Sequence, residues 1–133
     1  SGIKCEVVDD ILRYVWLKTI INSSINPVAA YAKVINGDLR KPELNRIVRK
    51  ICTESTRISE KVGINLPLEP RSEIKKIIRN TAENKCSMLQ DLENGRQTEI
   101  DAINGEIARI ADSNGLDATY NKEFIEKIKS VSN

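Results

Sequence analysis

The stretch YVWLKTIINSSIN, residues 14–26, is mostly apolar, yet it carries polar side chains at a regular spacing of four residues. At about 100° per residue in a helix, Lys18, Asn22 and Asn26 form one slightly spiralling polar row about 12 Å long. An ammonium beside two carboxamides suits a small oxygen-rich anion, because lysine offers charge and a proton and each asparagine both donates and accepts hydrogen bonds. A solvated helix face is the alternative interpretation, and the spacing alone does not separate the two.

A second stretch, NKCSMLQDLENGRQTEIDAING, also has polar residues at helical spacing. Asn84, Ser87 and Asp91 are three and four residues apart, so we expect them on one face of a helix. Glu99 is expected to open the next helix, where an acid favours the helix dipole. Each of these residues alone is more often an ordinary surface residue than a ligand-binding one.

The elements that must position these residues are predicted to be helices, because apolar residues repeat with a helical period almost throughout the chain. The first helix is expected from about Val7 to Lys33, with Pro27 kinking or splitting it because proline lacks a backbone N–H. Asn36-Gly37 predicts a turn, and no segment alternates as a strand. The predicted fold class is all-α, a single irregular helical bundle of five or six helices.

Helix ends can also be predicted from single residues. Pro42 and Gly63 are expected to start and stop the second helix. A later helix is expected to have Thr98 as its N-cap and to end at Gly115, and Thr119 is the expected cap of the last helix.

Composition limits the function classes. The chain has 133 residues, about one domain, with 21 basic and 19 acidic residues and no long basic run. We therefore expect no nucleic-acid or membrane partner, and no apolar run reaches the ~20 residues needed to cross a bilayer.

Three sparse cysteines, Cys5, Cys52 and Cys86, predict neither a disulfide framework nor a metal site, and they are typical of a cytoplasmic protein. Ser1-Gly2 is the expected remnant of a cleaved tag, and 3–133 the expected domain.

Three segments together resemble one known family: WLK…N…NP, NGDLR and TAENKCSMLQDLENGRQTEIDAING. They are similar to the C-terminal domain of ketopantoate reductase, also called 2-dehydropantoate 2-reductase, over about Glu6 to Lys129. The resemblance implies an NADP-dependent oxidoreductase that reduces 2-dehydropantoate to pantoate, toward pantothenate and coenzyme A. It also implies two domains: an N-terminal Rossmann domain binds NADP(H), and a helical domain makes most contacts with the small-molecule 2-oxo acid substrate.

The resemblance also assigns roles to residues. Lys18 matches the catalytic lysine, which would stabilise negative charge on the carbonyl oxygen and act as a general acid. Glu99 matches a glutamate that reaches toward the cofactor, and Asp91 would have a supporting role. The substrate contacts would come from four polar residues, Asn22, Asn26, Asn36 and Ser87.

The sequence departs from the family pattern in several places. Cys86 stands where a serine is common and is expected to be a small packing residue, Ala102 replaces a larger residue, and Thr119 stands where proline is usual. No GxGxxG motif occurs, so the dinucleotide-binding half is expected to be absent from this chain, which alone should be inactive.

Two alternatives stay open at the level of sequence. A reductase of the same architecture for another 2-oxo acid is one, and the departures at Ala102 and Thr119 indicate it. The other is a stand-alone helical module without an active site, such as a dimerisation domain. A homodimer is a weaker expectation, because the cleft-facing surface around Lys18 and Ser87 would be open without a partner domain.

Overall fold

The computed structural model describes residues 2–132, with side chains from residue 10 onward. The expected tag remnant at Ser1, and the side chain of Cys5, lie outside the described residues. In the part of the chain that is described, all regular structure is helical, which confirms the all-α prediction. The elements are α1 (Gly2–Ala32), the 3-10 helix η1 (Asn36–Arg40), α2 (Pro42–Lys61), α3 (Pro70–Asn80), α4 (Ser87–Glu93), α5 (Asn104–Ser113) and α6 (Thr119–Ser130).

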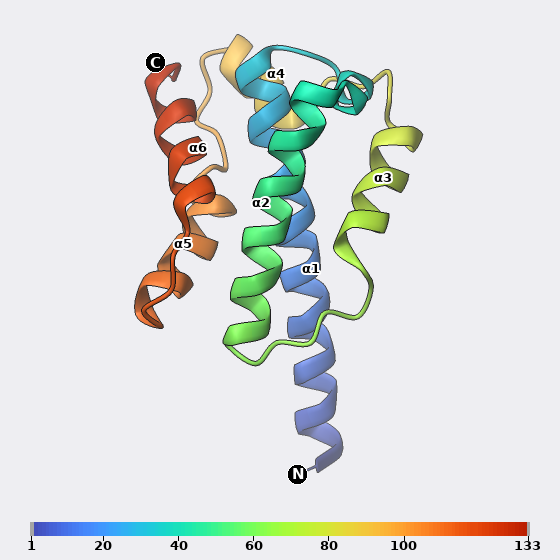
Figure 1. The fold of residues 1–133 in the computed structure, drawn as a ribbon, viewed down its shortest axis with the longest axis vertical. Helices are drawn as coiled ribbons and strands as arrows, with labels where there is room; N and C mark the ends of the chain where they lie inside the picture. Colours follow the sequence, from blue (N-terminus) through green and yellow to red (C-terminus); the bar gives the residue numbers. More distant parts are fainter. Residues whose placement is uncertain (1, 133) are drawn as a thin grey trace.

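Helix α1 is the central element of the bundle, and η1 and every later helix packs against it (Figure 1). Helix α2 runs antiparallel beside α1, α3 lies on one flank, and α5 and α6 lie on the other. Helix α4 lies across the end of the bundle at which α1 stops. Side chains on the part of α1 inside the bundle are therefore close to other elements, and this part of α1 can organise a site.

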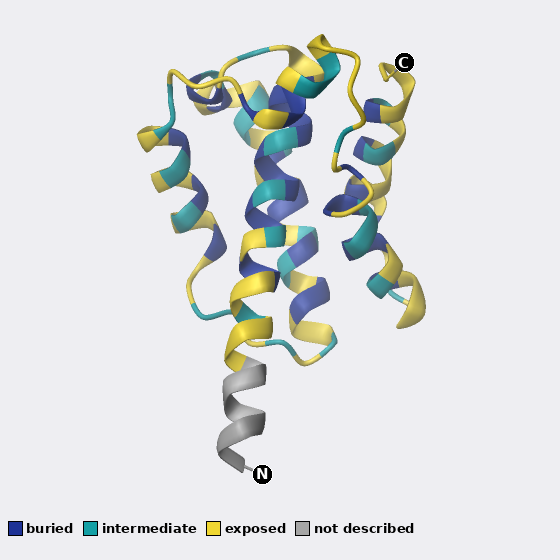
Figure 2. Ribbon diagram, turned by 180° about the vertical axis from the view of Figure 1, so that it is seen from behind, coloured by how far each residue is buried: buried dark blue, intermediate teal, exposed yellow. Residues whose placement is uncertain are grey.

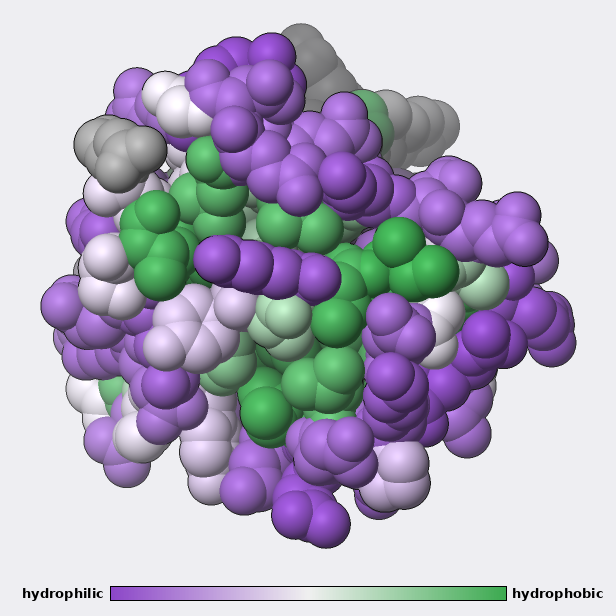
Figure 3. All heavy atoms as spheres, turned by 90° about the horizontal axis from the view of Figure 1, so that it is seen from above, coloured by the Kyte–Doolittle hydropathy of each residue, from purple (hydrophilic) through white to green (hydrophobic). Residues whose placement is uncertain are grey.

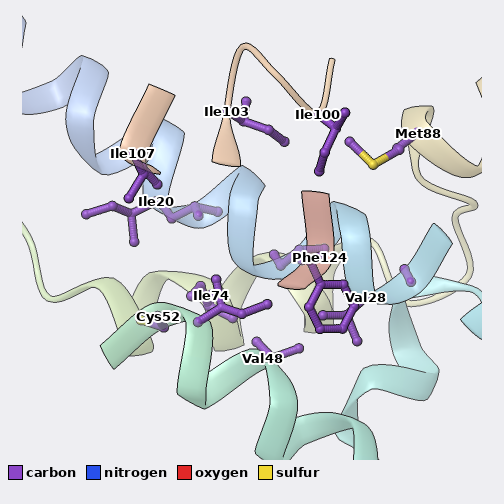
Figure 4. Close-up of a cluster of buried hydrophobic side chains, with 14 of the residues drawn as sticks. Ile20, Val28, Val48, Cys52, Ile74, Met88, Ile100, Ile103, Ile107 and Phe124 are labelled. Atoms are coloured by element: carbon purple, nitrogen blue, oxygen red, sulfur yellow. The ribbon is translucent and has the colours of Figure 1, made fainter. Parts of the chain in front are cut away.

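The burial pattern of α1 explains its central place. From Trp16 onward most of its side chains are buried, whereas those between residues 10 and 15 are mostly exposed on the end that projects from the bundle (Figure 2). Ile20 and Ala29 are fully buried. Residues from the other helices complete one continuous core, including Val48, Ile74 and Phe124 (Figure 4). Burying one such isoleucine or phenylalanine stabilises the fold by about 1.5–3 kcal/mol.

Pro27 lies inside α1, and the helix continues past it to Ala32. Of the two predicted effects of Pro27, splitting of the helix is therefore wrong, and a kink stays a prediction. Proline lacks the N–H that would donate to the carbonyl of Ser23, four residues earlier. The side-chain Nδ2 of Asn104 donates to that carbonyl instead, at 3.1 Å. A side chain from α5 thus replaces the hydrogen bond that proline removes, and the helix stays continuous.

The helix predicted to begin at Thr98 begins instead at Asn104. The carbonyl of Glu99 accepts from the N–H groups of Ala102 and Ile103, at 2.9 and 3.1 Å, which forms a tight turn ahead of the helix. The spacing of isoleucines there is helical in the sequence, but a turn followed by a helix buries them equally well. Glu99 therefore precedes α5 and does not open it.

Two further details of the predicted helix ends are wrong. Asn84 lies in the turn before α4, so it shares no helix face with Ser87 and Asp91; its carbonyl accepts from the N–H of Asn36 at 3.0 Å. Thr119 is the first residue of α6 and gives no side-chain cap, a role that a distant glutamate takes over. The predicted ends at Pro42, Gly63 and Gly115 are confirmed, and both glycines have positive φ, +85° and +67°. Only glycine adopts that conformation without a steric cost.

Candidate functional site

The polar row on α1 is present and is accessible. Lys18 is exposed, and Asn22 and Asn26 are partly exposed, while their neighbours Trp16 and Ile20 are buried. Within the described residues, none of the three polar side chains forms an intramolecular hydrogen bond or ion pair. Their donors and acceptors therefore remain available to water or to a ligand.

The start of α4 is attached to this row through Cys86. Its Sγ accepts from the N–H of Leu89 at 3.4 Å, as an N-cap does, and donates to the carbonyl of Asn26 at 3.6 Å. Cys86 is buried, and burial raises the pKa of its thiol. The prediction of a small packing residue is confirmed, and the cap is an addition that the sequence did not indicate. Ser87 follows directly as the exposed first residue of α4, so the start of that helix lies at the backbone of Asn26.

Asn36 holds η1 against the segment that leads into α4. Its N–H donates to the carbonyl of Asn84 at 3.0 Å, and its side-chain Nδ2 donates to Oγ1 of Thr81 at 2.9 Å. The neighbouring Gly37 donates to the carbonyl of Ala82 at 2.8 Å, a contact so close that a Cβ at position 37 would meet that oxygen at 2.8 Å. Asn36 is therefore already partly engaged in the fold. Its buried Oδ1 has no partner among the described residues, and Nδ2 keeps a second N–H beyond the one bonded to Thr81.

The two acidic candidates differ in their surroundings. Asp91 forms an ion pair with Arg96 at 3.1 Å, and its carbonyl accepts from the N–H of the same arginine at 2.8 Å, so it closes the turn after α4. Glu99 is exposed, and its carboxylate makes no hydrogen bond within the part of the chain described. The structure brings the start of α4, at Cys86 and Ser87, to the backbone of Asn26. Lys18 lies two helical turns from Asn26 along α1, an offset of about 12 Å.

A buried polar chain, which we call the amide relay, was not predicted from the sequence. Asn104 donates through Nδ2 to the carbonyl of Ser23 and to Oδ1 of Asn121, both at 3.1 Å. Asn121 in turn donates to Glu54 at 2.9 Å and to Ser55 at 3.0 Å. Both asparagines have no exposed surface. The relay joins α1, α5, α6 and α2, and Pro27 was its one indication in the sequence, because an internal proline leaves a carbonyl four residues back in need of a donor.

Glu54 ends the relay and also caps α6. Its carboxylate accepts from the N–H groups of Tyr120 at 3.0 Å and Asn121 at 2.9 Å. A negative charge there is favourable, because the first N–H groups of a helix lack partners and carry partial positive charge. The cap comes from a residue more than 60 positions away in the chain, which local sequence patterns do not reveal.

The described residues contain no group of three or more possible metal-ligating side chains. None of the described helices is both long enough and apolar enough to cross a bilayer.

The chain is similar to known proteins over nearly its whole length. The family model described as ketopantoate reductase PanE/ApbA C terminal matches residues 10–132. Among curated relatives, the 2-dehydropantoate 2-reductase of Archaeoglobus fulgidus is 35% identical over 98% of this chain and 44% of that protein. That of Pyrococcus horikoshii is 37% identical over 91% of this chain and 40% of that protein. The chain thus spans less than half the length of these relatives.

Solved structures agree with the sequence comparison. A PanE/ApbA family ketopantoate reductase from Ralstonia eutropha matches 87% of this chain and 39% of its own, with a TM-score of 0.81 and 26% identity. A D-mandelate dehydrogenase with NADH and anilino(oxo)acetate matches 92% of this chain and 41% of its own, with a TM-score of 0.75; at 23% identity this likeness shows the fold alone. Since the family model covers almost the whole chain, this polypeptide belongs to the ketopantoate reductase C-terminal domain family.

Proposed function

We propose that this chain is the substrate-binding half of a 2-dehydropantoate 2-reductase, which converts ketopantoate to pantoate with NADPH. The observation that supports this most is the row of Lys18, Asn22 and Asn26, whose side chains have no partner in the described part of the chain and whose Asn26 end meets the start of α4, the helix that Ser87 begins. Family membership supplies the reaction class.

In the proposed reaction, the side chains of this chain bind the 2-oxo acid, orient it and donate a proton to its carbonyl oxygen. Addition of hydride to a ketone places negative charge on its oxygen, and the Lys18 ammonium would stabilise that charge and donate the proton. The amides of Asn22 and Asn26 and the hydroxyl of Ser87 would hold the substrate's carboxylate and hydroxyl. Asn36 would contribute its Oδ1 and the second N–H of Nδ2, because the first N–H is already bonded to Thr81.

The cofactor would be bound mainly by a domain that is not part of this chain. NADPH supplies the hydride when it is bound. The exposed carboxylate of Glu99 is a hydrogen-bond acceptor with no partner in the described residues, so it fits an approach to cofactor hydroxyl groups. Asp91 would act indirectly, by fixing the turn between Ser87 and Glu99 through Arg96.

The projecting end of α1 fits the proposal of a preceding domain. Ile11, Tyr14 and Val15 expose 60%, 57% and 54% of their surface, which is unusual for apolar residues so close in sequence. Packing of a dinucleotide-binding domain against this end would bury them.

The proposal is tested by replacing Lys18 in the two-domain enzyme. We expect Lys18→Ala to lower turnover of ketopantoate by about 10²–10⁴-fold, the usual contribution of general acid–base catalysis. Because Lys18 is exposed and unpaired in the described part of the chain, the melting temperature should not change. Lys61→Ala, at an exposed lysine in the last turn of α2, is the matched control and should leave turnover unchanged. Turnover within a few-fold of the parent in Lys18→Ala would refute the assignment.

A second candidate is a reductase of the same architecture for another 2-oxo acid. The observation that favours it is that the D-mandelate dehydrogenase shares this fold. A panel of 2-oxo acids assayed with NADPH and with NADH separates the two candidates.

The predicted homodimer and the cytoplasmic location also stay predictions. A Staphylococcus aureus ketopantoate reductase of the same fold is described as dimeric. Seen from the end of the bundle where the C terminus lies, this chain presents an apolar area crossed and rimmed by hydrophilic residues (Figure 3). Such an area fits a contact with a second copy.

A further inference from the structure

The outer face of α2 carries a concentration of positive charge that the proposed function does not use. Arg46, Arg49, Lys50 and Arg57 are all exposed on this helix. At about 100° per residue they fall within an arc of about 100°, centred opposite the buried stripe of Val48 and Ser55. The cluster is not visible as a basic run in the sequence, because only Arg49 and Lys50 are adjacent.

These residues line a pocket and not a plain convex surface. Together with Thr53, Glu54 and Tyr120, the four cations line an open pocket of ≈ 340 Å³ between α2 and the start of α6. This volume lies at the lower end of the range for small-molecule sites, about 300–1,000 Å³. Tyr120 forms one wall, with the Lys50 ammonium 5.6 Å from the centre of its ring.

The charge in this pocket is not neutralised from within. Among the described residues, none of the four cations has a carboxylate within 4.0 Å, although eight other pairs on the surface do. The single acid in the pocket, Glu54, directs both of its oxygens to the N–H groups of α6 and to Asn121. Like charges three and four residues apart destabilise a helix. A helix that retains them is expected to gain something by it, which points to a ligand of opposite charge.

We propose that this pocket binds a small phosphate-bearing molecule. Guanidinium groups match phosphate oxygens with paired hydrogen bonds, and three arginines within about 16 Å along one helix can contact more than one phosphate. The exposed part of the Tyr120 ring offers a flat surface to any ring attached to those phosphates. None of the lining residues belongs to the candidate site on α1, so the proposal does not depend on the proposed reaction.

The test uses inorganic pyrophosphate as the probe, titrated into the ¹⁵N-labelled chain at constant ionic strength. We expect saturable shifts of backbone signals confined to residues 46–57 and Tyr120. The double variant Arg49→Gln/Arg57→Gln should weaken binding by about tenfold or more, since hydrogen bonds between charged groups are worth a factor of this size each.

The matched control removes the same charge elsewhere. Arg79→Gln/Lys33→Gln replaces two exposed cations that do not line the pocket, and it should bind pyrophosphate as the parent chain does. Far-UV circular dichroism checks that both variants are folded. Absence of saturable binding by the parent chain, or an equal loss in both double variants, would overturn the proposal, because the second result would mean general attraction by net charge.

Discussion

Asparagines occur both in the amide relay and in the polar row on α1, but their side chains are bonded within the fold only in the relay. In the amide relay, Asn104 and Asn121 are completely buried and are bonded to α1, α2 and each other. In the row on α1, Asn22 and Asn26 reach the surface with no side-chain partner in the described chain. The residue type is the same in both regions, so the difference lies in where the partners are.

The difference has an energetic side. A buried amide that loses its partners costs about 1–3 kcal/mol, so the relay ties four helices together and tolerates little change. In the row on α1, the asparagines lower the free energy of unfolding instead of raising it. Asparagine in a helix interior is less favourable than alanine by roughly 0.7 kcal/mol, and no internal hydrogen bond compensates. The relay therefore serves stability, whereas the row reduces stability slightly, as expected of residues kept for function.

The largest expected effect comes from matched alanine substitutions in the two regions. Asn104→Ala leaves the carbonyl of Ser23 and Oδ1 of Asn121 without their donor, so the free energy of unfolding should fall by about 2–3 kcal/mol. Asn22→Ala should change it by less than about 0.7 kcal/mol, and toward greater stability. Urea denaturation of both variants measures this. Equal losses at the two positions would show that the row is structural too.

A smaller effect on the free energy of unfolding is expected from the single hydrogen bond of Asn104 to the carbonyl of Ser23, which replaces the bond that Pro27 cannot form. In a Pro27→Ala background, residue 27 regains an N–H that can donate to the carbonyl of Ser23. Asn104→Ala should then cost about 1 kcal/mol less than it does beside proline, since neighbouring residues that share a partner are coupled by about 0.5–3 kcal/mol. A double-mutant cycle gives this coupling directly. Additivity of the two substitutions within about 0.3 kcal/mol would mean that Asn104 does not compensate for proline.

The same contrast explains what could be predicted from the sequence. Helical periodicity, Pro42 and the glycines after helices are local, so the all-α fold and most helix ends were predicted correctly. Spacing on one helix also sufficed to predict the row of Lys18, Asn22 and Asn26. The relay, the cap that Glu54 gives to α6 and the cap at Cys86 depend on residues brought together only by the fold. The start of α5 was missed for the same reason, since Asn104 is placed by its contact with α1.

The smallest expected effect on the free energy of unfolding comes from replacing two exposed glutamates, of which one is hydrogen-bonded and the other is not. Glu69 caps α3: its carboxylate accepts from the N–H groups of Arg71 at 2.8 Å and Ser72 at 3.3 Å, and from the Ser72 hydroxyl at 2.9 Å. The bond from the Arg71 N–H, followed by that from the Ser72 side chain, lowers the pKa of Glu69. Glu99 makes no such bond in the described residues and serves as the matched control.

The lowered pKa fixes the direction of the pH dependence. In the window between the ordinary pKa of a glutamate and the lower folded one, the unfolded chain binds more protons, so stability falls as pH falls. At neutral pH, Glu69→Gln should lower the free energy of unfolding by roughly 0.5–1 kcal/mol, the size of an N-cap contribution. That difference from the parent chain should shrink as pH falls through the folded pKa of Glu69.

The comparison with the parent chain removes other acid-sensitive contributions, such as Glu106, whose pKa is lowered by its hydrogen bond from Arg109. Glu99→Gln should leave the free energy of unfolding at neutral pH close to that of the parent chain, because its carboxylate makes no hydrogen bond or ion pair in the described residues. Urea midpoints measured at neutral and at acidic pH for both variants test this. If Glu69→Gln and Glu99→Gln had the same free energy of unfolding, a carboxylate bonded to a helix start would contribute no more to stability than an unbonded one. The lack of internal hydrogen bonds would then no longer distinguish the row on α1 from ordinary exposed residues.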